Sequence, residues 1–170
     1  MGMLFPKGQA EFSECGSYRY LLTREWGPAK PLVAVMLNPS TADAEEDDPT
    51  IRRLCGFAED NGCGGVRVLN LFAFRATDPE AMRVASDPVG PRNDSVIARE
   101  LVAAASTRMP VLAAWGAHRW VEGRDMAVWR MVPGVQWRCL GTTKDGHPKH
   151  PLYVPKSQPF LPWAPRGATA

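Results

Sequence analysis

Long apolar segments are missing from this sequence. No stretch reaches the roughly 18 uninterrupted apolar residues of a membrane-spanning helix, and the N-terminal stretch MGMLFPKGQAEFSEC lacks the basic segment and apolar core of a secretory signal. The composition, with 45% hydrophobic and 22% charged residues, is that of an ordinary soluble globular protein. We therefore expect a cytoplasmic protein with no membrane partner.

Several catalytic and nucleotide-binding motifs are also absent. The chain contains no GxxxxGK[ST] and no GxGxxG pattern, so neither a phosphate-binding loop nor a dinucleotide-binding turn is indicated. No serine stands in a GxSxG pattern, which leaves acyl transfer without an anchor. The net charge of +2 is too small to indicate a nucleic-acid partner by itself. None of these features assigns a function.

Cysteine is scarce, and its spacing excludes the familiar metal motifs. The four cysteines show no CxxC pair, so neither a zinc ribbon nor a redox motif is predicted: Cys15, Cys55, Cys63 and Cys139. Free thiols are the simplest interpretation. An iron–sulfur cluster built from distant cysteines stays open, because ligands need to converge only in space.

At 170 residues, the chain predicts one domain over 1–170, with a core at about 15–155 and a Pro-rich tail at 156–170 that lies on the surface or frays. Short apolar or alternating runs predict strands at 17–26, 32–37, 66–72, 111–116 and 135–141. The first two, with the turn GPAKP between them, predict a hairpin that leads into a buried strand.

Helical spacing of apolar residues predicts helices at 48–62, 77–85, 93–107 and 118–132. Asp48 is the expected N-cap of the first helix, with Pro49 at its first position. Strands that alternate with helices predict an α/β fold, specifically a three-layer α/β/α domain with a mainly parallel central sheet.

Polar side chains follow each predicted strand. In an open parallel sheet, ligands bind beyond the carboxyl ends of the strands. The polar and turn residues expected at this edge are Asn38, Pro39, Ser40, Thr41, Asn70, Arg75, Gly116, His118 and the segment 142–150. The sequence therefore predicts a ligand site at this edge.

Asn70 is the most informative of these positions, because asparagine is rare in strands and here it interrupts the apolar run VRVLNLFAF. A buried amide needs partners for its donors and its acceptor. It either satisfies neighbouring loop backbone or recognises the edge of a planar ligand.

The segment DGHPKHPLYVP contains two His-Pro pairs, at His147 and His150, and proline keeps each preceding histidine out of helical conformation, in an exposed loop. A neutral imidazole at His150 can donate a hydrogen bond to a departing or anionic group. A solvated surface histidine is the alternative.

The acidic run Glu45, Glu46, Asp47 and Asp48 precedes the first helix, where carboxylates favour the helix dipole. Capping is the favoured interpretation over a metal site, because the carboxylates are consecutive in sequence.

Taken in order, the motifs MLNPS, VLNLFAFRA, VLAAWGAH and HPLYV resemble those of the uracil-DNA glycosylase superfamily. The whole chain also resembles domain-of-unknown-function family 1643, through LNPSTAD, DDPT, NLFAFRAT and HPLY. The superfamily resemblance implies a glycosylase-like fold, with Asn38 orienting the attacking water and His150 donating to the base. It implies substrate contacts from Pro39, Ser40, Asn70, Phe72, Arg75, Trp115, Gly116 and Tyr153.

The first motif differs from the superfamily in offering no aromatic residue before the next helix, so Phe72 or Phe74 is expected to stack on the base. The leading hypothesis is hydrolysis of an N-glycosidic bond in nucleic acid, with single strands preferred because a paired base must first leave the stack. It needs no cofactor and no metal. The alternatives are a non-catalytic nucleobase, nucleotide or nucleic-acid binding module and a hydrolase of free nucleosides or nucleotides. No protein partner is inferable.

Overall fold

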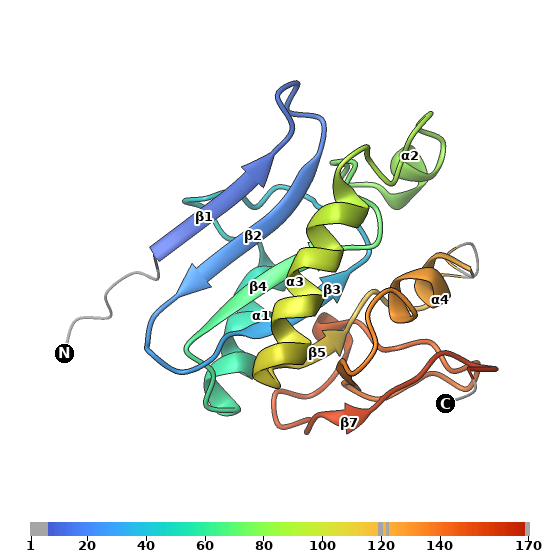
Figure 1. Cartoon of the computed structure of the whole chain (residues 1–170). Helices are drawn as coiled ribbons and strands as arrows, with labels where there is room; N and C mark the ends of the chain where they lie inside the picture. The colour runs from blue at the N-terminus through green and yellow to red at the C-terminus, as the bar shows by residue number, and fades with distance from the viewer. Residues whose placement is uncertain (1–6, 119–120, 122, 169–170) are drawn as a thin grey trace.

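The computed structural model describes residues 7–118, 121 and 123–168, which form seven strands and four α-helices around one sheet (Figure 1). The strands are β1 (Lys7–Phe12), β2 (Arg19–Glu25), β3 (Leu32–Met36), β4 (Gly65–Asn70), β5 (Pro110–Ala113), β6 (Gln136–Cys139) and β7 (Leu161–Pro162). Their order across the sheet is β1-β2-β4-β3-β5-β6-β7.

The sheet is mixed rather than mainly parallel as a whole. Its centre is parallel, since β3 pairs with β4 and β5, and β5 pairs with β6. Antiparallel strands extend both edges, with β1 and β2 on the β4 side and β7 on the β6 side. The predicted α/β class is confirmed, and the parallel description applies to the four central strands only.

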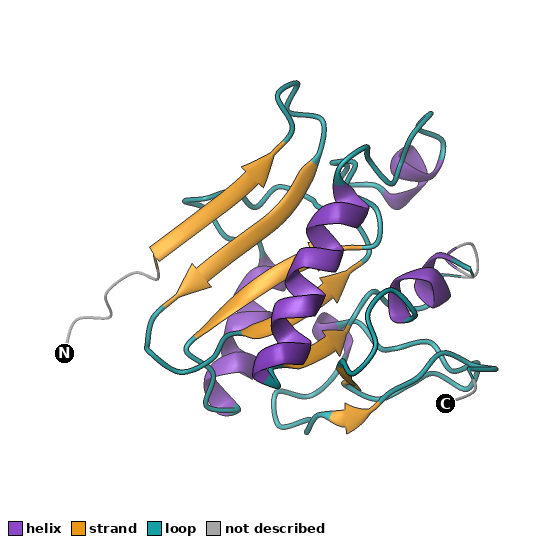
Figure 2. Cartoon of the chain, in the orientation of Figure 1, coloured by secondary structure: helices purple, strands orange, loops and turns teal. Residues whose placement is uncertain are grey.

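Helices cover both faces of this sheet, as Figure 2 shows. The two long helices are α1 (Pro49–Asp60) and α3 (Asn93–Thr107), and the short ones are α2 (Pro79–Arg83) and α4 (Arg124–Trp129). Alternate side chains of β3 point to opposite faces, so Ala34 packs with α1 residues such as Leu54, whereas Val35 packs with α3 residues such as Leu101. In the described part of the chain, no helix is both long enough and apolar enough to cross a membrane.

The start of α1 matches its sequence signal. Asp48 is the N-cap, its side chain accepts a hydrogen bond from the Ile51 backbone N–H at 2.9 Å, and Pro49 opens the helix. The buried face of α1 includes Phe57, whereas Cys55 is only half-buried. The capping interpretation of the acidic run is therefore confirmed for Asp48.

The predicted hairpin and tail need correction. Strand β2 does not pair with β3, because β4 lies between them; β2 instead pairs with β1, a strand the sequence analysis does not predict. The Pro-rich tail contributes β7 and buries Trp163, whose ring meets those of Trp115 and Trp137 edge-on. The core therefore extends beyond residue 155. Strand β7 covers the edge of β6, and the Trp163 ring packs against the two other buried indoles.

The fourth predicted helix is shorter than expected. Only α4 is α-helical among the described residues of 118–132, and residues 119, 120 and 122 of that prediction lie outside the described part. Gly123 has φ +93° and precedes α4 as its N-cap, a backbone conformation that is unlike a helix interior. The glycine thus starts this helix rather than lying within it.

Candidate functional site

A cavity of about 690 Å³ opens at the carboxyl edge of β3, β4 and β5. We call it the edge cavity. Of the ten site residues that the sequence predicts, these seven line it: Asn38, Ser40, Asn70, Trp115, Gly116, His150 and Tyr153. Residues from four separate segments therefore meet at one place, as the rule for parallel strands predicts.

Asn70 is held rigidly at the floor of the edge cavity. It is the last residue of β4, lies opposite Met36 of β3 and is 1% exposed. The buried Asn93 side chain donates to the carbonyl oxygens of Asn70 and Leu71, at 3.0 and 3.2 Å, and fixes the backbone from the other side. Neither polar atom of the Asn70 side chain has a partner among the described residues. The amide donor and acceptor of this cavity-lining residue are therefore both buried and unpaired.

Asn38 is oriented by the loops that follow β3 and β4. Its Nδ2 donates to the carbonyl oxygens of Pro39, at 3.1 Å, and Ala76, at 2.8 Å. Both amide hydrogens are thereby used on the backbone, and the Ala76 N–H in turn donates to Pro39 O at 3.0 Å. The remaining Oδ1 is an acceptor only, which suits a group that orients a water molecule by accepting its hydrogen.

His150 has its tautomer set by the backbone. It is the N-cap of the 3-10 helix η2 (Pro151–Tyr153), and its Nδ1 accepts a hydrogen bond from the Leu152 N–H at 3.2 Å. Burial, with a smaller contribution from His118, lowers the His150 pKa below its ordinary value, which keeps the ring neutral at physiological pH. A neutral imidazole that accepts at Nδ1 carries its proton on Nε2, so Nε2–H is the available donor.

The predicted extended backbone before proline is present at His150, with φ −72° and ψ 141°. The side chain is half-buried, so the prediction of an exposed loop is wrong at this histidine. Backbone hydrogen bonds explain the burial: Gly116 N–H donates to Pro148 O at 3.1 Å and Lys149 N–H donates to Gly141 O at 2.9 Å. These bonds pull the His-Pro loop against the end of β5.

Gly116 shapes the space between the two histidines. Its φ is +85°, and a Cβ there would lie 3.6 Å from His150 Cβ and 3.7 Å from His118 Nε2. The space alone would accept a methyl group, but the left-handed backbone favours glycine. Burial, followed by the charge of His147, lowers the pKa of His118. Both imidazoles beside Gly116 are consequently neutral.

Three predicted site residues do not line the edge cavity. Phe72 is buried in the core cluster on the α3 face, and Pro39 is buried beneath the loop it begins. Arg75 donates to Gly16 O at 3.1 Å and lies over the Phe12 ring at 4.7 Å. Phe74 packs against the same core cluster as Phe72. Neither phenylalanine reaches the site, whereas the 84% exposed Tyr153 offers an aromatic face at its rim.

The sequence analysis did not identify two charged residues of the edge cavity as site residues. Arg19 begins β2, which runs antiparallel to β4, so the start of β2 reaches the edge where β4 ends. Asp48, already the N-cap of α1, is the single carboxylate among the described lining residues. The helix N-terminus that points at the site could have signalled Asp48, but nothing local in the sequence signals Arg19.

No metal site is formed by the described residues, where no three His, Cys, Asp or Glu side chains gather. The four cysteines are free thiols spread between the surface and the core. Burial raises the pKa of Cys55 to about 12, which leaves it a protonated and unreactive thiol. The structure therefore offers no cluster of cysteines in the described part.

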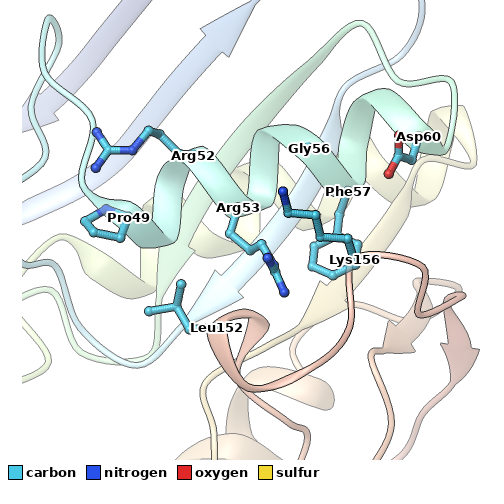
Figure 3. Close-up of a pocket in the computed structure, with 8 residues that line it drawn as sticks. All are labelled: Pro49, Arg52, Arg53, Gly56, Phe57, Asp60, Leu152 and Lys156. Atoms are coloured by element: carbon cyan, nitrogen blue, oxygen red, sulfur yellow. The ribbon is translucent and has the colours of Figure 1, made fainter.

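A second, shallower groove runs along α1 beside η2, and we call it the α1 groove (Figure 3). Arg52, Arg53 and Lys156 give it a positive lining, against the single carboxylate of Asp60. Arg53 is anchored by a hydrogen bond to Val154 O. Leu152 lines both the α1 groove and the edge cavity, so the two hollows adjoin.

Comparison with known families supports one assignment. The family described as "Protein of unknown function (DUF1643)" matches residues 19–152, a span that includes the whole edge cavity except Tyr153. The chain belongs to this family. The DUF1643 match begins at Arg19 and ends at Leu152, both of which line the cavity. No curated protein and no solved structure matches the chain.

Proposed function

We propose that the protein binds a nucleobase in the edge cavity and hydrolyses its N-glycosidic bond, preferentially in single-stranded nucleic acid. The observation that carries this proposal is the Asn70 amide, which is 1% exposed and has no partner on either polar atom among the described residues. A buried amide left unpaired costs free energy that a complementary ligand recovers. A base edge with an adjacent donor and acceptor is such a ligand.

The proposal includes a three-layer fold of the uracil-DNA glycosylase type. It is supported by the order of Asn38, Asn70, Trp115–Gly116 and His150 along the chain, and by their meeting at one edge of the sheet. In this interpretation Asn70 holds the base, and Tyr153 takes the stacking role first given to Phe72 or Phe74.

The reaction breaks the C1′–N bond and forms a C1′–O bond with water. Asn38 Oδ1 accepts one hydrogen of the attacking water and aims its lone pair, since both Nδ2 hydrogens are already committed. Asp48, the single carboxylate among the described lining residues, takes the proton that the water loses on attack, and the Ile51 N–H occupies one of its two oxygens. The base leaves with the bonding electron pair, and His150 Nε2–H donates to its carbonyl oxygen.

The preference for single strands has two supports. A paired base must leave the stack before it can enter a cavity, which costs a few kcal/mol that an unpaired base avoids. The α1 groove adjoins the cavity through Leu152, and its cations suit one phosphodiester backbone. The exposed Glu45 and Glu46 lie on the loop before α1 and repel the second backbone of a duplex.

We expect Arg52→Ala and Lys156→Ala each to flatten the salt dependence of oligothymidylate binding. Losing one backbone contact reduces the slope of log affinity against log salt by about 0.7 for a single strand. Fluorescence anisotropy at several salt concentrations measures this slope. Arg130→Ala, which removes an exposed arginine outside the groove, is the control. Equal slopes in wild type and the three variants would show that the α1 groove is not part of the binding surface.

The proposed activity is tested by base release from single-stranded oligonucleotides that contain uracil, hypoxanthine or 5-hydroxymethyluracil, detected as alkali-sensitive abasic sites. Asn70→Ala is expected to lower release on the order of 100-fold, as for removal of one preorganised donor. Asn61→Ala removes an amide that only caps α1, and it should retain activity. An Asn70→Ala protein that releases base as fast as wild type contradicts the proposal.

A free-nucleotide hydrolase is the second candidate, favoured by the exposed acidic residues Glu45 and Glu46 on the loop that leads to the cavity-lining Asp48. Release of base from mononucleotides but not from oligonucleotides would select it. Binding of the oligonucleotides without any release would instead select a non-catalytic binding module, in which Asn70 recognises a base and the hydrolytic step is lost.

A further inference from the structure

Arg19 is a buried cation that forms no ion pair with the described residues. It is 2% exposed and lines the edge cavity. Its Nη1 donates to Ala42 O at 2.7 Å, its Nε has no partner, and no carboxylate of the described residues forms an ion pair with it. A buried guanidinium that lacks an anion is costly, so its retention calls for an explanation.

The other buried arginine of β2 is paired with a carboxylate, unlike Arg19. Arg24 is also 2% exposed, and it pairs with Asp47 at 2.8 Å. On the neighbouring strand β4, Arg67 makes a two-pronged pair with Glu100, at 2.6 and 2.9 Å. Arg19 is the exception, and it is also the one of the three that faces the edge cavity. The missing anion is therefore expected in the cavity.

Arg19 remains charged in this setting. Burial lowers its pKa to about 10, while the Asp48 carboxylate acts in the opposite direction, so the guanidinium is protonated at neutral pH. Asp48 forms no ion pair with Arg19, and one of its oxygens accepts the hydrogen bond from the Ile51 N–H. Lys149 adds a second cation to the cavity lining. The cavity thus combines two neutral amides, at Asn38 and Asn70, with an excess of positive charge.

The backbone explains why the cation and the amide share one cavity. Arg19 N–H donates to Ala73 O at 3.0 Å, which joins the start of β2 to the segment just beyond Asn70. A purely structural role would be limited to the hydrogen bond with Ala42 O, and that role needs no positive charge. A guanidinium fork instead matches two oxygens of a phosphate group.

We propose that the edge cavity takes its base as a phosphate-bearing nucleotide, with the phosphate oxygens bound by Arg19. This inference rests on the proposed function, because it names the form in which the base enters. The shared chemistry is a phosphate attached to a nucleoside, and its source is either a free mononucleotide or the strand itself.

The test compares the affinity of nucleosides and of their 5′- and 3′-monophosphates for the full chain by isothermal titration calorimetry. We use the uracil, hypoxanthine and 5-hydroxymethyluracil deoxynucleosides as hydrolysis-resistant 2′-fluoroarabino analogues. Wild type is expected to prefer a monophosphate by about tenfold or more, as for a charge-assisted hydrogen-bond pair. Arg19→Gln should lose that preference and keep its affinity for the nucleoside. Arg92→Gln, which removes an exposed arginine paired with Glu11, should retain both.

Oligonucleotides with one uncharged methylphosphonate linkage beside the target base separate the two sources. A weakening of about tenfold that Arg19→Gln abolishes assigns the phosphate to the strand. If a methylphosphonate on neither the 5′ nor the 3′ side of the target base weakens oligonucleotide binding, and free monophosphates are still preferred, the bound phosphate belongs to a mononucleotide. No preference for phosphate in wild type, or an undiminished preference in Arg19→Gln, overturns the inference.

If Arg19→Gln does not fold, competition in wild type decides instead. Inorganic phosphate at tens of millimolar should displace the monophosphate but not the nucleoside, and failure to displace it overturns the inference. Phosphate preference without base release would disprove the proposed hydrolysis alone. Base release without phosphate preference would disprove the role of Arg19 alone.

Discussion

Asp48→Asn is expected to lower the rate of base release about 1,000-fold, within the range for loss of a general base. The substitution removes the carboxylate that takes the proton from water but keeps a side-chain oxygen for the Ile51 N–H. Asparagine and aspartate are equally good N-caps, so the melting temperature should stay within about 2 °C of wild type. Single-turnover release and a thermal melt measure the two effects.

Asp48→Ala is the matched variant. It loses both the base and the cap, so its activity should match that of Asp48→Asn while its stability falls by about 1 kcal/mol. The separation of the two effects identifies Asp48 as more than a cap. If Asp48→Asn releases base at the wild-type rate, Asn38 orients a water that needs no carboxylate, and the general-base role is wrong.

His150→Ala is expected to lower base release by more than 100-fold, which corresponds to about 3 kcal/mol for one preorganised donor to a developing oxyanion. The effect should appear in the rate of the bond-breaking step, since the charge on the base develops only there. His147→Ala is the control, because His147 also precedes proline and does not line the edge cavity. Equal losses in both variants would indicate a defect of the loop rather than of the donor.

The titration of the His150 ring gives a second test of its neutral form. Burial lowers its pKa, so the neutral donor persists below the ordinary histidine value of about 6.5 and is lost only when the pH falls through the lower pKa. The His150 imidazole, followed by its NMR chemical shifts, should therefore titrate with a midpoint below pH 6.5. A midpoint above 6.5 would mean that the imidazole is stabilised in its charged form, which contradicts the neutral tautomer set by Leu152 N–H.

The lining of the edge cavity was predictable where it consists of residues next to strand ends. Asn38, Asn70, Gly116 and His150 were found because each follows or ends an apolar run, and parallel strands bring such ends together. The prediction that Phe72 lies in the site was wrong because a sequence does not state on which face of the sheet a residue beyond the strand will pack. Phe72 packs in the core cluster on the α3 face.

The sequence by itself determined the α/β class, the central strands, the start of α1 at Asp48 and seven residues of the cavity lining, because these depend on local periodicity and capping. Only the tertiary structure decided the antiparallel edges, the burial of Trp163 and the arrival of Arg19 at the site. Arg19 reaches the edge cavity through the pairing of β2 with β4, whose aligned residues are 40 to 46 positions apart. Such pairing follows from long-range hydrogen bonding and packing, which no local pattern records.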